Sequence, residues 1–216
     1  MSNNKEYEYT FIDYDKNLII DNIKKLGGIK QGIYLFRVMV FIHPKDQSNN
    51  YMRVRDEGFR ISMTYKNNLD KKFSNEYEVD IDNFDTGIKI LLGLGCKKKY
   101  YYEKIREIYY IKDTMIAFDL NPGKTERMEV ESKDLKTLTS IVKKLGLNEK
   151  NRCIEGVTPN MYKELFGIKI PSNVDLTFIN MKKVLKPLVK KNMKEFEQLI
   201  KIQKKYYKKI IKLNKN

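Results

Sequence analysis

Glu6-Tyr7-Glu8-Tyr9, close to the N-terminus, and Met128-Glu129-Val130-Glu131, much further along the chain, are the stretches that decide the fold. Each contains two glutamates two residues apart, and a β-strand places residues i and i+2 on the same face. If both stretches are strands, each points two carboxylates in one direction. Paired carboxylates repel each other unless a cation lies between them, and hard divalent ions such as Mg²⁺ and Mn²⁺ prefer oxygen ligands. The two stretches therefore predict a divalent metal ion held jointly by distant parts of the sequence.

The composition is that of one domain of ordinary size with an extension. The chain has 216 residues, of which 41% are apolar, so a packed core can form. It contains no run of about 18 apolar residues, the length typical of a transmembrane helix, and its N-terminus lacks the apolar stretch of a signal peptide. One histidine (His43) and two cysteines (Cys96 and Cys153) have neither zinc-binding nor disulfide-framework spacing. We therefore expect a cytoplasmic protein in a reducing environment.

The positive charge is concentrated at the C-terminal end. The formal net charge is +15, and residues 150–216 hold 17 Lys and Arg against 5 Asp and Glu. Residues 1–149 hold the other 26 basic residues against 23 acidic ones. A sequence pI of about 9.5 permits nucleic-acid binding without requiring it.

Alternating patterns predict eight strands, and amphipathic patterns predict helices between them. Asp15 is placed to cap the first helix, and Asn83 or Asp85 the second. The predicted helices cover residues 15–26, 83–92 and 133–145, and the polar residues 67–74 are expected to form a loop. The predicted strands are residues 6–13, 34–42, 51–55, 59–66, 76–80, 100–111, 115–120 and 125–131.

The turn before the last strand contains Gly123-Lys124-Thr125, which resembles part of a phosphate-binding loop. Phe118 stands where that loop needs its first glycine. We therefore interpret these residues as a hairpin turn.

Charged and polar residues recur at period two on successive predicted strands. On a half-exposed sheet, each set is explained by a solvated face with cross-strand ion pairs. If instead the sheet curls into a barrel, the sets line an interior that needs water and a charged ligand. The sets are Glu6/Glu8, Arg53/Arg55, Thr64/Lys66, Glu76/Glu78/Asp80, Lys104/Arg106 and Glu129/Glu131.

The ordered motifs resemble those of one family. They are Glu6-Tyr7-Glu8-Tyr9-Thr10, Arg53-Val54-Arg55, Thr64-Tyr65-Lys66, Lys104-Ile105-Arg106, the stretch from Ala117 to Gly123, Met128-Glu129-Val130-Glu131 and Met161-Tyr162-Lys163-Glu164-Leu165. Over about residues 4–168 the chain resembles the CYTH family, the triphosphate tunnel metalloenzymes. The resemblance implies an α+β fold. An eight-stranded antiparallel β-barrel with flanking helices would cover residues 1–170, and a basic helical extension residues 171–216.

The resemblance also implies a function and a set of site residues. The implied function is that of a divalent-metal-dependent triphosphatase acting on a nucleoside, inorganic or thiamine triphosphate or on an RNA 5′-triphosphate. The implied ligands of Mg²⁺ or Mn²⁺ are Glu6, Glu8, Asp119, Glu129 and Glu131. The implied phosphate-binding residues are Arg53, Arg55, Lys66, Lys104 and Arg106. The implied catalytic residues are Glu6, Glu8, Lys66 and Glu78, while Glu76, Glu78 and Asp119 are alternatives for a second metal or for positioning the nucleophile.

One departure from the family pattern leaves the activity open. Thr10 stands where the opening motif of the family has a lysine, and a hydroxyl cannot supply the positive charge. Arg37 or Lys66 is an alternative source of that charge. Two other functions therefore stay open: a class IV-type adenylyl cyclase that makes cyclic AMP, and a catalytically weak barrel that binds nucleotide, polyphosphate or RNA.

The end of the chain predicts a further helix. From Met193 to Ile211 apolar residues recur at near-helical spacing, with lysines between them. Such a helix can pack against the barrel or against another protomer, which would make a homodimer. It can also bind nucleic acid or lie on acidic lipid.

Overall fold

The computed structural model describes residues 7–45, 50–70, 73–153, 157–171 and 173–213. Its strands are β1 (Tyr7–Phe11), β2 (Ile29–Ile42), β3 (Tyr51–Asp56), β4 (Ile61–Asp70), β5 (Phe73–Asp80), β6 (Lys97–Ile111), β7 (Thr114–Leu120) and β8 (Arg127–Ser132). Its α-helices are α1 (Lys16–Lys25), α2 (Phe84–Gly93), α3 (Leu135–Lys144), α4 (Val157–Phe166), α5 (Met181–Leu185) and α6 (Met193–Leu213). Two short 3₁₀ helices, η1 (Glu149–Asn151) and η2 (Lys186–Leu188), complete the described structure.

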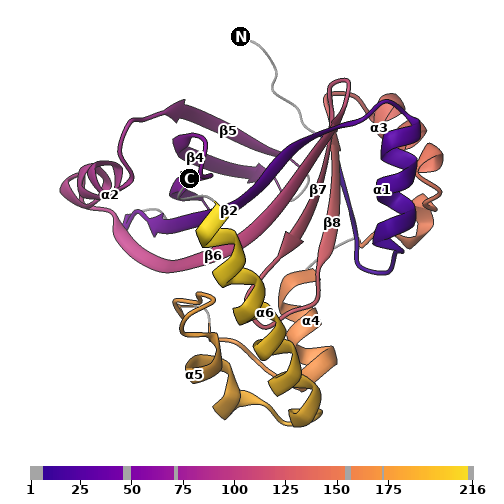
Figure 1. Ribbon diagram of the computed structural model, residues 1–216. Coiled ribbons are helices and arrows are strands. Elements are labelled where there is room, and N and C mark those ends of the chain that lie inside the picture. The colour runs from indigo at the N-terminus through magenta and orange to yellow at the C-terminus, as the bar shows by residue number, and fades with distance from the viewer. Residues whose placement is uncertain (1–6, 46–49, 71–72, 154–156, 172, 214–216) are drawn as a thin grey trace.

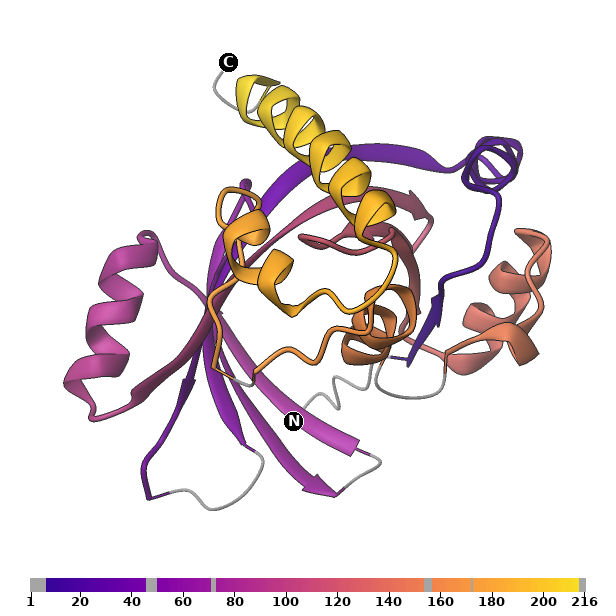
Figure 2. The same cartoon turned by 90° about the horizontal axis from the view of Figure 1, so that it is seen from below.

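The eight strands form one antiparallel sheet in the order β1-β8-β7-β6-β2-β3-β4-β5. The predicted α+β fold, with eight antiparallel strands and flanking helices, is thereby confirmed. The first and last strands are neighbours, and Glu8 lies opposite Glu131 in their register. The sheet curls strongly (Figures 1 and 2). Its edge strands β1 and β5 are not paired with each other in the part of the chain that the structure describes, so the sheet is a curled barrel without hydrogen-bonded closure.

Most predicted elements are present, but one predicted loop is wrong and several strand ends are shifted. Asp15 and Asn83 cap α1 and α2 through their side chains, as expected. The loop predicted for residues 67–74 is wrong, because β4 continues to Asp70 and β5 begins at Phe73. Backbone pairing of Asn67 with Asn75 extends this hairpin, and backbone hydrogen bonds do not require apolar side chains. The strand predicted for residues 34–42 begins earlier, at Ile29, where it pairs with the end of β6.

The apolar core lies on the convex side of the curled sheet, in three clusters. Helices α1 and α3 pack side by side over β7 and β8, where Phe118 and Leu138 are buried. Helix α2 covers the other end of the sheet around Phe41 and Val54. The alternating strands therefore place most of their apolar residues outward, under the helices, and the period-two charged sets on the concave face. Glu107 is an exception, because it is buried on the helix side, where it pairs with Lys16 of α1.

The C-terminal part packs against the same sheet. Ile105 of β6 belongs to one cluster with Tyr162, Phe178, Phe196 and Tyr207 from the region after the barrel. In Figure 1 helices α4 and α5 lie below the sheet, and Figure 2, viewed from below, shows them in front of one end of the curl. The expectation that α6 packs against the barrel is borne out by these contacts. The boundary at residue 170 stays a prediction.

A short backbone bridge ties the C-terminal segment to the sheet. Leu176 pairs in parallel with Tyr102 beyond the end of β7. The Leu176 N–H donates to the Tyr101 carbonyl, and the Glu103 N–H donates to the Leu176 carbonyl.

None of the helices in the described ranges is both long and apolar enough to cross a membrane.

Candidate active site

The concave face gathers the charged residues that the sequence pattern singled out. The strand register places Arg53 opposite Thr64, Thr64 opposite Glu78, and Lys66 opposite Glu76. On the other side of the curl, Arg106 lies opposite Asp119, and Asp119 opposite Arg127. Six of the eight strands thus supply charged side chains to these pairings, and β1 adds Glu8. Glu6 lies outside the described residues.

Asp119 is the centre of one ion-pair network. Asp119 is fully buried, and its carboxylate accepts hydrogen bonds from Arg106 at 2.6 Å and from Lys104 at 2.9 Å. Arg127 adds a third contact, at 3.3 Å. Burial alone would raise the pKa of Asp119, but the charges of Arg106 and Lys104 outweigh it and hold that pKa far below its usual range. Both carboxylate oxygens of Asp119 are therefore paired with cations of the protein.

Glu129 joins this network to β1. It is buried and forms ion pairs with Arg106 and with Arg127, the latter at 2.6 Å. Glu8 is exposed on the same face, where the surrounding sheet displaces part of its water. This desolvation and the charge of Glu129 raise the pKa of Glu8. Thr10 donates a hydrogen bond to Glu8 at 3.1 Å.

A second network lies across the curl on β3, β4 and β5. Arg53 pairs with Glu76 at 3.3 Å and Arg55 with Glu78 at 3.3 Å. Lys66 pairs with Glu76 at 2.6 Å. Burial and the neighbouring charge of Arg53 lower the pKa of Arg55. The acids of β5 thus only partly compensate the positive charge of β3.

Lys104 shows the same excess of positive charge in the first network. Burial and the charge of Arg106 lower its pKa to about 8, despite its ion pair with Asp119. Its ammonium also lies over the ring of Phe36, 5.2 Å from the centroid. The ring face attracts a cation, so Phe36 compensates part of the charge that the acids leave.

Sequence reasoning missed two basic residues of this region. Arg127 continues the alternation of Glu129 and Glu131 on β8, so the period-two pattern could have identified it. Lys124 does lie in the turn before β8, as predicted, but its side chain is buried, with its ammonium 4.4 Å from the ring centroid of Tyr162. Burial, and then the charge of Arg127, lowers the pKa of Lys124 to about 7. A turn motif alone does not reveal this burial, because Tyr162, whose ring lies against the ammonium, comes from α4.

The predicted metal ligands are brought together only in part. Glu8 and Glu131 face each other across β1 and β8, and Thr10 lies opposite Glu129. No three His, Cys, Asp or Glu side chains within the described ranges lie close enough together to hold a metal ion. The predicted ligand Glu6 is outside those ranges. Cys96 and Cys153 are both free thiols.

Residues 4–153 match the family model of the CYTH domain, which is more than half of the chain. The chain belongs to the CYTH family. The resemblance inferred from the ordered motifs is thereby confirmed. No curated protein matches the chain.

Solved structures share the CYTH fold at low sequence identity. A protein from Vibrio parahaemolyticus described as a candidate adenylate cyclase has a TM-score of 0.61 and 14% identity, covering 70% of this chain and 94% of its own. The PH1012 protein from Pyrococcus horikoshii OT3 has a TM-score of 0.58 and 23% identity, covering 69% and 94%. A conserved protein from Pyrococcus furiosus has a TM-score of 0.57 and 18% identity, covering 71% and 98%. These matches show the fold alone.

Proposed function

We propose that this CYTH protein is a divalent-metal-dependent triphosphatase whose substrate binds on the concave face of the sheet. The observation that carries the proposal is the gathering of four basic residues on one face of the sheet by the two strands that flank β2, namely Arg53 and Arg55 on β3 and Lys104 and Arg106 on β6. Two of these four have a lowered pKa, because burial and a like charge are not fully compensated by the acids present. A polyphosphate supplies the missing negative charge.

Lys124 is proposed as a further phosphate ligand. Its ammonium is buried next to the Tyr162 ring, and no ion pair to it is formed by the described acids. A buried cation without an anion is costly, and a bound phosphate would relieve that cost. Lys124 thus offers a source of the positive charge that the opening motif lacks at Thr10, alongside Lys66 and Arg37. Arg37 is the weaker choice, because its guanidinium lies over the ring of Phe84 in α2, on the face of the sheet that the helices cover.

The acids of β1 and β8 fit a divalent cation. Glu8 has a raised pKa because desolvation and the charge of Glu129 oppose its ionisation, and a cation between the two would remove this repulsion. Carboxylate oxygens are the ligands that Mg²⁺ and Mn²⁺ prefer. We propose Glu8, Glu129 and Glu131 as ligands together with Glu6. When bound, the ion supplies positive charge that stabilises the transferring phosphoryl group.

The reaction proposed is hydrolysis of the terminal phosphoanhydride bond. Water attacks the terminal phosphorus, the bond to the bridging oxygen breaks, and diphosphate and phosphate leave. The arginines and lysines hold the phosphate chain and stabilise its developing charge. Glu78 is the acid proposed to orient the water. It accepts a hydrogen bond from Thr64 at 2.7 Å, and Thr64, Arg55 and Arg60 lower its pKa although desolvation acts in the opposite direction, so it is ionised at neutral pH.

A second candidate is a barrel that binds polyphosphate without turnover. Thr10 favours it, because the hydroxyl that replaces the lysine is itself engaged with Glu8. In that case the Thr10→Lys variant restores turnover, while the wild-type protein binds the same ligands and releases no product.

The test is an assay of products. The protein is incubated with ATP, tripolyphosphate, thiamine triphosphate or 5′-triphosphorylated RNA, each with Mg²⁺ or Mn²⁺, and phosphate, pyrophosphate and cyclic AMP are measured. The proposal expects metal-dependent phosphate release that Glu131→Gln lowers by about 100-fold or more, whereas the exposed control Glu195→Gln leaves it unchanged. Cyclic AMP together with pyrophosphate would overturn hydrolysis in favour of a cyclase.

A further inference from the structure

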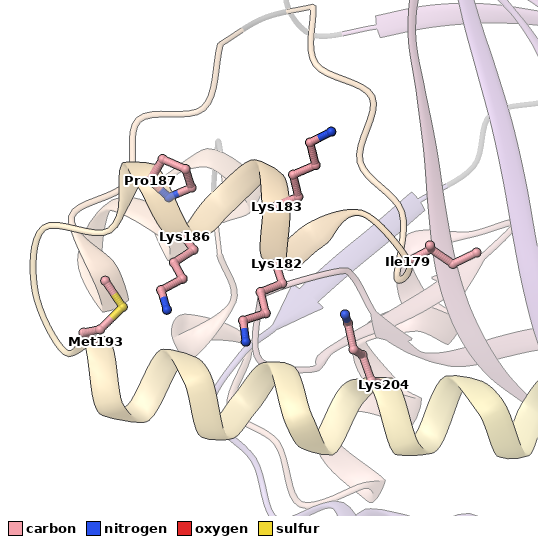
Figure 3. A pocket seen from close by; sticks show the side chains of 7 residues that line it. All are labelled: Ile179, Lys182, Lys183, Lys186, Pro187, Met193 and Lys204. Carbon is pink, nitrogen blue, oxygen red and sulfur yellow. The ribbon is translucent and has the colours of Figure 1, made fainter.

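A groove between two C-terminal elements is lined mainly by lysines. It has a volume of about 680 Å³ and lies between α5 with η2 on one side and α6 on the other. In Figure 3, Lys182 and Lys186 point from α5 and η2 toward α6, and Lys204 points back from α6. Ile179, Lys183, Pro187 and Met193 complete the lining. The groove lies outside residues 4–153, so it is not part of the family's shared site.

The groove has a net positive charge. Among the described residues, one acid forms an ion pair with a lysine of the groove: Glu197 pairs with Lys186 at 2.6 Å. Lys182 and Lys204 have no ion pair with any acid in the part of the chain that the structure describes. Two facing walls therefore present ammonium groups to the same space, and like charges facing each other favour a bound anion.

The lysines continue from the groove along one face of α6. Lys201, Lys204, Lys208 and Lys212 follow each other at spacings of three or four residues, so they lie in a row on the helix. The opposite face carries Phe196, Ile200, Gln203, Tyr207 and Ile210, which are buried against the rest of the protein. A row of this kind fits an extended polyanion better than a single small anion.

We propose that the groove and the lysine row of α6 bind the phosphodiester backbone of single-stranded RNA. Burial of the apolar face of α6 argues against an acidic membrane as the partner, because an interfacial helix needs that face free for lipid. None of the residues that line the groove is aromatic, so bases have no ring to stack on there. The surface therefore binds RNA through phosphates and without sequence preference.

The experiment measures binding of a fluorescent single-stranded RNA with a 5′-hydroxyl end, by anisotropy at several salt concentrations. The 5′-hydroxyl end removes the triphosphate, so the result does not depend on the proposed triphosphatase. Point variants of the whole 216-residue chain are used, since α6 is part of the core and cannot be removed. The test variant is Lys182→Gln/Lys186→Gln/Lys204→Gln. The control variant, Lys25→Gln/Lys89→Gln/Lys144→Gln, removes the same charge from exposed positions on α1, α2 and α3.

The groove variant is expected to bind RNA about tenfold or more weakly at low salt. The slope of log K against log salt concentration is expected to fall by about 2, since each phosphate contact on a single strand contributes about 0.7. The control variant is expected to keep both values close to those of the wild type. Equal losses in the two variants would overturn the proposal, because they would reflect net charge alone. The proposal would also be overturned if phosphatidylserine vesicles, or polyglutamate, bound the wild-type protein as tightly as the RNA does.

Discussion

At the scale of single residues, the concave face combines basic and acidic side chains whose charged forms are both disfavoured. Arg55 and Lys104 have a lowered pKa, because burial and a neighbouring cation oppose their charge. Glu8 has a raised pKa, because desolvation and Glu129 oppose its charge. A bound triphosphate would stabilise the positive charges of Arg55 and Lys104, and a bound divalent cation would stabilise the negative charge of Glu8. A metal–triphosphate complex would do both. Site residues that destabilise the empty protein are expected where function requires a ligand.

Glu8 gives a prediction that links stability to function. A carboxyl group with a raised folded-state pKa contributes its stability below the unfolded pKa, and this contribution is lost as the pH rises through the folded pKa. At pH 7 without metal, Glu8→Gln is therefore expected to raise the Tm, and the difference is expected to vanish near pH 4. The same substitution is expected to abolish the gain in Tm that Mn²⁺ gives the wild type. Thermal unfolding at both pH values measures this, with exposed Glu195→Gln as the control. A lower Tm for Glu8→Gln at pH 7 without metal would contradict this prediction, because it would show that Glu8 stabilises the metal-free protein.

Lys124 gives a prediction about pH. Because its pKa is lowered to about 7, its ammonium is largely lost by pH 8.5, and triphosphate binding should weaken over this range. Lys124→Arg keeps its charge and is expected to reduce that pH dependence, and Lys104, whose pKa is lowered to about 8, accounts for the part that remains. Lys124→Met is expected to weaken tripolyphosphate binding about tenfold at pH 6.5, the worth of one charge-assisted hydrogen bond of ~1.5 kcal/mol. Titration of each variant at pH 6.5 and 8.5 measures these effects. Identical pH profiles for wild type and Lys124→Arg would exclude Lys124 as the titrating group.

At the scale of elements, α6 holds the turn between β7 and β8. Gln203 of α6 is buried, accepts a hydrogen bond from the Gly123 N–H at 2.7 Å and donates to the carbonyls of Asn121 and Lys124. Tyr162 of α4 donates a hydrogen bond to the Pro122 carbonyl. Asp119 precedes this turn and Arg127 follows it. The C-terminal helices thus fix the backbone that connects two members of the site's ion-pair network.

Replacement of Gln203 tests this connection. Gln203→Leu leaves the Gly123 N–H and the Lys124 carbonyl without their partner, and each such buried group costs about 1–3 kcal/mol. The Asn121 carbonyl keeps the hydrogen bond from the Lys124 N–H at 3.2 Å. We expect a loss of about 2–4 kcal/mol in the free energy of unfolding, measured by urea denaturation, together with a lower kcat/KM. Gln198→Leu makes the same substitution at an exposed position of the same helix and is expected to change neither value. Unchanged activity in a destabilised Gln203→Leu would mean that the turn is held for stability alone.

At the scale of the whole molecule, the sequence predicts the sheet better than it predicts the contacts across it. Period-two alternation identified Arg53, Arg55, Lys104, Arg106, Glu8 and Glu129, because a strand fixes which residues share a face. It could not identify the burial of Lys124 or the role of Gln203, since both depend on helices that follow the barrel. The loop predicted for residues 67–74 failed for a related reason, because pairing with a neighbouring strand outweighed local polarity.

The helical C-terminal region was predicted as an element, while its contacts were left open. Apolar spacing indicated a buried face for α6, and the structure shows that face packed against residues of the sheet. The convergence of Lys182, Lys186 and Lys204 on one groove is not visible in the sequence, because it depends on how α5 and α6 lie beside each other. The composition predicts that the C-terminal region is positively charged, but only the fold shows that three of its lysines meet at one groove.

The most direct measurement is a calorimetric titration of tripolyphosphate into the wild-type protein at pH 7, with and without Mn²⁺. Binding itself is measured, so the result holds whether or not Thr10 limits turnover. The account predicts one saturable site that requires Mn²⁺, weakened about 100-fold in Glu131→Gln and in Arg106→Met, and unchanged in the groove variant Lys182→Gln/Lys186→Gln/Lys204→Gln. Binding of equal strength without metal, or binding lost only in the groove variant, would contradict a metal-dependent triphosphate site on the concave face.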